Sequence, residues 1–209
     1  ANRSVFSLGE TEWKALLDSD WFPFVSLPKQ ILKNLVGRAK RAGDIDLLVP
    51  EVVKVVRERM PNMLEHWASV PEFASHLDLV KHAAARFLKR DFISAVAIIF
   101  PRIEGILRSI FAILSPTDRP SQNRLAATLL HSGGTELHPY SWLLPERFYE
   151  YLKESYFADF EPGLPAKLSR HSIGHGVADQ REFNEKHAAI GFLILDQISF
   201  LIRRSNSTP

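Results

Sequence analysis

The polar segment 169–176 contains the residues of this sequence that are best suited to chemistry. Arg170 and His175 lie five positions apart in it. A guanidinium group presents a planar fork of N–H donors that matches phosphate oxygens and stays charged at any working pH. An imidazole titrates near neutrality, so it can accept and return a proton. Together these residue types suit cleavage of an RNA phosphodiester, where the substrate's own 2′-hydroxyl is the nucleophile and no metal is required.

The segment resembles the ribonuclease motif of the HEPN superfamily. Members of that family carry Arg, then a polar residue, then a short run that ends in His. The corresponding run here is Arg170-His171-Ser172-Ile173-Gly174-His175, followed by Gly176. A second stretch, Phe100-Pro-Arg-Ile-Glu-Gly-Ile-Leu-Arg108, is similar to a central-helix pattern of HEPN proteins linked to abortive infection and phage defence. The resemblance covers about residues 70–204 and does not reach residues 1–68.

The resemblance implies a metal-independent endoribonuclease in a phage-defence or toxin system. Arg170 would bind the scissile phosphate, His175 would be the general acid or base, and His171 would position the phosphate or orient its neighbours. His171 departs from the family pattern, in which Asn is commoner at this position. The resemblance also implies RNA as substrate, no cofactor, a homodimer whose two motifs face a shared cleft, and an antitoxin or another defence component as partner.

The same residues also have structural interpretations. Arg170 can pair with a carboxylate such as Glu104 or Asp179, and His175 can cap the last helix. Glu104 precedes Arg108 by four residues, so these two can form an ion pair along one helix. Alternatively, Glu104 reaches the motif and orients Arg170 or His175, with Asp179 as a further supporting residue. The corresponding alternative function is a non-catalytic domain that binds RNA or a nucleotide, or that mediates assembly of a larger protein.

A metal site is the weaker alternative for the two histidines of the motif. His171 and His175 are four residues apart, which is a metal-ligand spacing on a helix. However, Gly174 and Gly176 argue against a regular helix there, and no third ligand is evident. The prediction is therefore that the site holds no metal.

The composition excludes several other classes of protein. The chain of 209 residues has no cysteine, which rules out disulfides, zinc fingers and thiol nucleophiles. Its formal net charge of +2 is too small for a broad basic nucleic-acid face. The apolar runs 92–100 and 188–195 are shorter than the roughly 20 residues that span a bilayer. We therefore expect a cytoplasmic protein with no membrane contact.

The hydrophobic period is helical along the chain and predicts an all-α, up-down helical bundle. Ser69 and Glu72 have the spacing of a capping box, Asp91 can cap the next helix, and Pro101 predicts a kink inside it. We expect a core bundle over 69–209 and a helical N-terminal extension over 1–68 that packs on it. The expected helices cover about 28–39, 50–60, 69–90, 91–114, 124–131, a stretch from 145 up to the breaker at 161–165, and 179–204, with a loop over 131–142.

Overall fold

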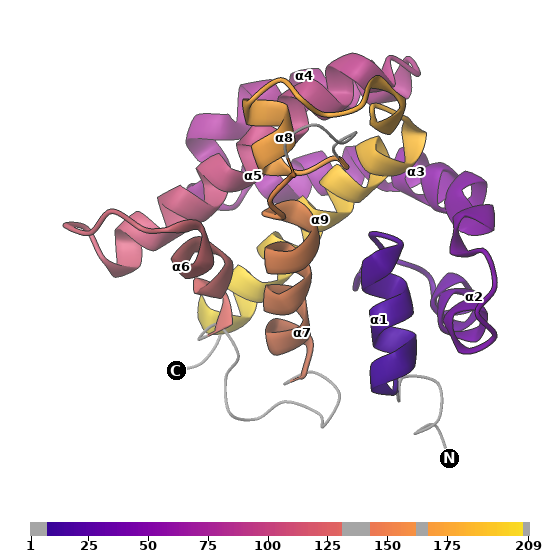
Figure 1. Cartoon of the computed structure of the whole chain (residues 1–209). Coiled ribbons are helices and arrows are strands. Elements are labelled where there is room, and N and C mark those ends of the chain that lie inside the picture. The colour runs from indigo at the N-terminus through magenta and orange to yellow at the C-terminus, as the bar shows by residue number, and fades with distance from the viewer. Residues whose placement is uncertain (1–7, 131–142, 162–166, 207–209) are drawn as a thin grey trace.

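The computed structural model describes residues 8–130, 143–161 and 167–206. Within these ranges the chain is helical and contains no β-strand, which confirms the predicted all-α bundle (Figure 1). The loop expected over 131–142 lies outside the described residues. No helix in the described part of the chain is long and apolar enough to cross a membrane.

The chain forms α-helices of 5 to 23 residues, with short 3₁₀ or π segments between some of them. In chain order the elements are α1 (Glu10–Asp18), α2 (Lys29–Lys40), η1 (Ile45–Leu48), α3 (Val49–Ala68), η2 (Pro71–His76), α4 (Leu77–Leu88), α5 (Phe92–Leu114), α6 (Gln122–Ala127), α7 (Leu143–Tyr151), the π segment η4 (Leu152–Tyr156), α8 (Arg170–Gly174), η5 (Gln180–Glu182) and α9 (Glu185–Asn206).

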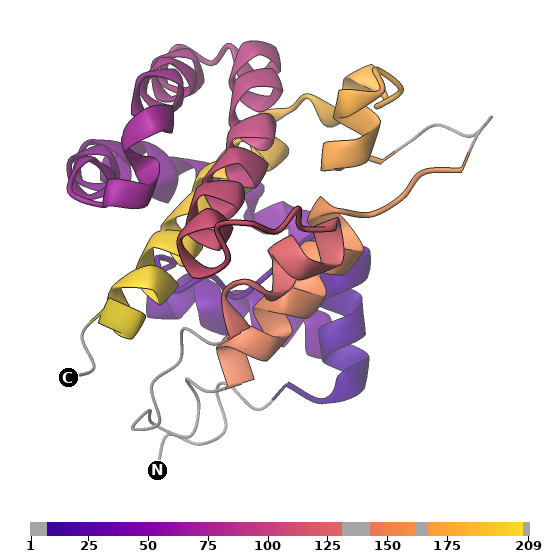
Figure 2. The same cartoon turned by 90° about the vertical axis from the view of Figure 1, so that its left-hand side faces the viewer.

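The last helix runs diagonally through the molecule and packs against both α5 and α3 (Figures 1 and 2). Between His187 and Ile202, every residue of α9 is buried except the partly exposed Asp196 and Phe200. A helix that is apolar nearly all round belongs in the centre of a bundle. The amphipathic α4 then covers α5 from outside, with Val80, Ala84 and Phe87 facing inward.

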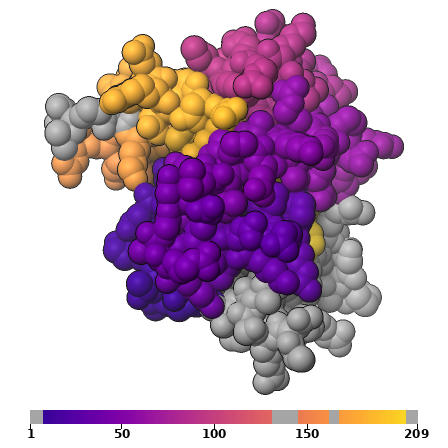
Figure 3. Space-filling model, turned by 90° about the vertical axis from the view of Figure 1, so that its right-hand side faces the viewer, coloured from indigo at the N-terminus to yellow at the C-terminus, as the bar shows by residue number. Residues whose placement is uncertain are grey.

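The N-terminal helices share one hydrophobic core with the rest of the chain. Trp21, Phe22 and Phe24 are fully buried and anchor the N-terminal segment in this core. The Phe22 ring centroid lies 5.1 Å from that of Phe148 and 5.4 Å from that of Tyr151. Figure 3 shows α1–α3 spread over one face of the molecule. The boundary between residues 68 and 69 stays a prediction.

Two expected helix starts are wrong, and one is confirmed. Ser69 does not open a helix, because its N–H and hydroxyl both bond to the His66 carbonyl and so end α3. A 3₁₀ segment follows, and α4 begins only at Leu77. Asp179 caps the short η5, so α9 begins later than expected. Asp91 caps α5 as predicted, since its carboxylate accepts from the Ser94 N–H at 3.1 Å.

The Tyr156 hydroxyl joins η4 to α5 on either side of Pro101. It donates to the Phe100 carbonyl at 2.5 Å and accepts from the Glu104 N–H at 3.0 Å. These two backbone groups are partners one helical turn apart, so the hydroxyl bridges them. Burial, reinforced by the charge of Glu104, raises the pKa of Tyr156 well above its usual value. The phenol therefore keeps its proton and holds Glu104 at a defined position on α5.

Replacing Tyr156 with phenylalanine is expected to lower the free energy of unfolding by about 1–3 kcal/mol, because two buried backbone groups lose their partner. Urea denaturation measures this directly. Tyr149→Phe is the matched control, since the Tyr149 hydroxyl makes no hydrogen bond within the described residues. An unchanged midpoint for Tyr156→Phe would mean that α5 closes its own hydrogen bond and that the bridge contributes nothing.

Candidate active site

The motif segment forms a short helix of its own. Ser169 accepts from the Ser172 N–H at 3.1 Å, and Ser172 Oγ accepts from the Ser169 N–H at 2.9 Å, which together form a capping box. The Ser172 hydroxyl also donates to the Lys167 carbonyl at 2.7 Å. These bonds start α8 despite the glycines, so the expectation of no regular helix there is wrong. Gly176 follows with φ of +69°, a conformation that glycine adopts without strain.

The structure brings Arg170 to Glu104 on α5. Arg170 Nε lies 2.6 Å from Glu104 Oε2 in an ion pair, although its N–H does not point at that oxygen. The other oxygen of Glu104 lies 2.7 Å from Arg108 Nη2, so the expected ion pair along α5 is also present. The Glu104 carboxylate is nearly buried between these two guanidinium groups. Within the described residues, neither terminal nitrogen of Arg170 makes a hydrogen bond.

Asp179 is not brought to Arg170. Its carboxylate instead lies 2.7 Å from Arg181 Nη2 and accepts the Arg181 backbone N–H at 2.9 Å. The side-chain hydrogen bond from Arg181, together with that backbone bond, lowers the pKa of Asp179 to about 2. Of the two carboxylates considered for Arg170, the fold therefore selects Glu104.

His171 is held at both ring nitrogens. Its Nδ1 lies 2.6 Å from Asp159 Oδ1, and its Nε2 lies 2.6 Å from the side-chain nitrogen of Gln122. Both ring nitrogens of His171 are therefore engaged by other side chains of the protein. The geometry gives His171 a positioning role.

His175 is exposed and ends α8 as its C-cap residue. It therefore does not cap α9, the structural role considered for it. Its ring centroid lies 6.1 Å from that of His171 and 5.6 Å from that of Phe160. Its nitrogens make no hydrogen bond within the part of the chain that the structure describes. Of the two motif histidines, His175 is thus the more accessible to a ligand.

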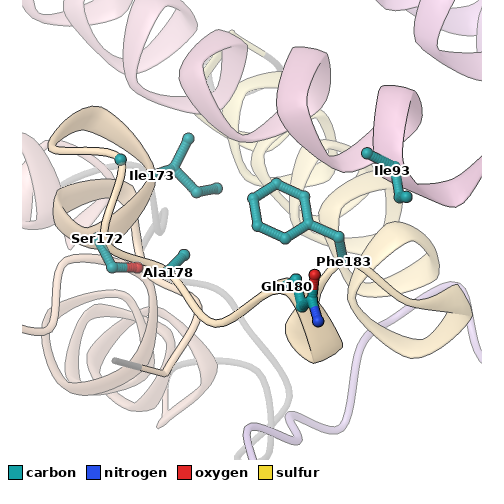
Figure 4. Close-up of a pocket in the computed structure, with 7 residues that line it drawn as sticks. Ile93, Ser172, Ile173, Ala178, Gln180 and Phe183 are labelled. Atoms are coloured by element: carbon teal, nitrogen blue, oxygen red, sulfur yellow. The ribbon is translucent and has the colours of Figure 1, made fainter. Parts of the chain in front are cut away.

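An apolar pocket of about 310 Å³ adjoins the motif segment. Ser172, Ile173 and Gly176 contribute to its wall. Figure 4 shows the Phe183 ring lying between the side chains of Ile173 and Ile93. The pocket can therefore make apolar contacts with a ligand, but the residues that line it include no acidic or basic side chain.

Gln122 and Asp159 were missed by reasoning from the sequence. Both lie outside the motif, 49 and 12 residues from His171, and neither belongs to a recognisable pattern. Among the described residues, no three His, Asp or Glu side chains gather closely enough to hold a metal ion. No family model, curated protein or solved structure matches this chain.

Proposed function

We propose that the protein cleaves RNA without a metal, in the manner of a HEPN endoribonuclease. The observation that carries the proposal is the arrangement of Arg170 and His175 on one short helix. Glu104 holds the guanidinium through Nε, and its terminal nitrogens lack hydrogen bonds in the described structure. An exposed imidazole lies at the other end of the same helix. The proposal requires that a phosphate bound to Arg170 also reaches the imidazole of His175.

In the proposed reaction, the 2′-oxygen of RNA attacks phosphorus and the bond to the 5′-oxygen breaks. The 2′-hydroxyl loses a proton and the leaving 5′-oxygen gains one, which leaves a 2′,3′-cyclic phosphate. His175 carries out one of these transfers. Arg170 stabilises the charge that develops on the phosphoryl oxygens. His171 and Glu104 act through other residues and are positioning residues.

A second proton-transfer group completes this reaction, and we propose that a second copy of the chain supplies it. In such a homodimer, His175 of each copy faces the motif of the other across one cleft. The apolar pocket beside Ile173 would offer contact to an unpaired base next to the cleaved bond. The proposed setting is the cytoplasm, in a phage-defence or toxin system with an antitoxin or a defence component as partner.

Binding of RNA or a nucleotide without cleavage is the second candidate function. It is favoured by one specific observation, the full hydrogen bonding of His171 to Asp159 and Gln122. With His171 held in this way, each copy offers a single proton-transfer group. Under this alternative Arg170 binds phosphate and no bond is broken.

The direct test is incubation of the purified protein with mixed-sequence RNA in EDTA, beside a His175→Ala variant. We expect cleavage by the wild type, products that end in a 2′,3′-cyclic phosphate, and a loss of roughly 100-fold or more in the variant. RNA binding without cleavage would support the second candidate. Cleavage that persists in His175→Ala would contradict the assigned role of this residue.

Gly174→Ala is expected to reduce cleavage strongly without changing any charge. A Cβ at this position would clash with Arg170 Nη1, so the guanidinium must move away from its place over α8. We expect a loss of roughly ten-fold or more, because small misplacements of a binding group are costly. The measurement is the single-turnover cleavage rate.

Gly176→Ala is the matched control for that experiment. It adds the same methyl group two residues later, where no atom lies within 4 Å, and it costs about 1 kcal/mol of backbone strain. We expect a much smaller loss of cleavage than for Gly174→Ala. Equal losses in the two variants would mean that strain in the segment, and not displacement of Arg170, lowers the rate.

A further inference from the structure

A second pocket, of about 270 Å³, lies between α3, α9 and the segment that precedes α2. It shares no lining residue with the candidate active site or with the apolar pocket beside it. Its wall combines apolar and polar side chains, and it includes one carboxylate and one guanidinium. The lining residues are Val25, Ser26, Arg59, Asn62, Met63, His66, Asp196 and Phe200.

The carboxylate belongs to Asp196 on the central helix α9. Burial raises the pKa of Asp196, while the nearby Ser26 hydroxyl, Arg59, His66 and the Trp67 indole act in the opposite direction. Ser26 is 3% exposed, and its hydroxyl has no aligned hydrogen-bond partner within the described residues. A buried polar group in that state costs stability unless a ligand or solvent atom satisfies it.

The guanidinium belongs to Arg59 on α3. Its Nη1 donates to the Ser26 carbonyl at 2.9 Å, which fixes the group beside the pocket. No ion pair within 4.0 Å joins Arg59 to Asp196 or to any other described carboxylate. The carboxylate of Asp196 and the guanidinium of Arg59 thus border the same pocket but do not form an ion pair. A ligand that carries both a positive and a negative group can bridge them.

We propose that this pocket binds a small zwitterion of the amino-acid class. Its ammonium group would donate to Asp196, and its carboxylate would bind the guanidinium fork of Arg59. The Ser26 hydroxyl would gain a partner, and Met63 and Val25 would contact the apolar part of the ligand. A coordinated metal ion fits poorly, because no three ligating side chains gather here among the described residues.

The test is calorimetric titration of the full chain with standard amino acids at millimolar concentration. Each amino acid is compared with its deaminated acid and its decarboxylated amine, as propionate and ethylamine are for alanine. We expect saturable binding of at least one amino acid and roughly ten-fold weaker binding of both analogues. The proposal is overturned if no amino acid binds, or if either analogue binds as tightly as its parent.

Two variants locate the binding to this pocket. Asp196→Asn and Arg59→Gln are each expected to weaken binding roughly ten-fold or more. Lys54→Gln is the matched control and should bind as the wild type does, since Lys54 is an exposed residue of α3 whose one ion pair among the described residues is with Glu58. Binding that survives both pocket variants would overturn the proposal.

Asp196→Asn is expected to stay folded. Because the folded-state pKa of Asp196 is raised above 3.8, the stability that this group contributes falls as pH rises from 3.8 through the folded-state value. Ionisation of this carboxyl group therefore costs stability, and an amide, which does not ionise, avoids that cost. If Asp196→Asn nevertheless unfolds, amino-acid binding by Arg59→Gln is the test of the pocket, because Arg59 is an exposed residue.

Discussion

Replacing Arg170 with alanine is expected to reduce RNA cleavage by roughly 100-fold or more. Arg170 is the only arginine or lysine of α8, so under the proposed mechanism its guanidinium is the donor of this helix that binds the phosphate. Charge on the phosphoryl oxygens grows in the transition state, so losing this donor should lower kcat more than it raises KM. Single-turnover cleavage in EDTA, with RNA binding measured separately, checks both parts of the prediction.

Arg181→Ala is the control that separates a specific role from a general loss of positive charge. Arg181 lies in η5, has a side chain that is 78% exposed, and pairs with Asp179. We expect this variant to cleave RNA nearly as the wild type does. Similar losses for Arg170→Ala and Arg181→Ala would indicate non-specific attraction of RNA and would count against the proposed mechanism. Arg170→Lys should recover little activity, because an ammonium group lacks the planar fork.

Replacing Glu104 with glutamine is expected to affect both stability and cleavage. The side chain is 9% exposed and lies between Arg170 and Arg108, so the change leaves two guanidinium groups without their anion. We expect the free energy of unfolding to fall by about 1–3 kcal/mol, because both arginines retain contact with solvent. Cleavage should fall roughly ten-fold, since Arg170 loses the group that orients it. Urea denaturation and single-turnover rates measure the two effects.

Arg108→Gln is the matched control for Glu104. Arg108 is 50% exposed and bonds to the opposite oxygen of the same carboxylate, so its loss should cost less than about 1 kcal/mol and leave Arg170 paired. The NMR chemical shift of the Arg170 Nε–H reports on the surroundings of this group. A loss of stability by itself does not change it. The signal should shift in Glu104→Gln and stay in place in Arg108→Gln. An unshifted signal in Glu104→Gln would contradict the positioning role.

The proposed active site was predictable from the sequence only in part. The Arg170 and His175 pair follows from residue type and from resemblance, whereas the sequence left Glu104 and Asp179 as alternative partners of Arg170. Gln122 and Asp159 do not follow from the sequence, because neither has a pattern that links it to His171. The hydrogen bonds that they make engage both ring nitrogens of His171, which no feature of the sequence indicates.

The sequence by itself determined what depends on neighbours within one or two helical turns. The all-α class follows from the hydrophobic period, and the start of α5 follows from the cap at Asp91. When a capping residue could belong to either of two neighbouring helices, the local sequence pattern does not determine which helix it caps. Ser69 ends α3 and does not open α4, because its N–H and hydroxyl are already bonded to the preceding turn.

Tertiary packing decided what depends on residues far apart in the chain. It paired Arg170 with Glu104 although Asp179 is much closer in sequence, because α8 packs against α5 while Asp179 is taken by Arg181. It placed the Tyr156 hydroxyl in a helical turn of α5. It also brought Arg59 and Asp196 to one pocket. Such contacts depend on which buried faces fit together, and no spacing within a single helix encodes that choice.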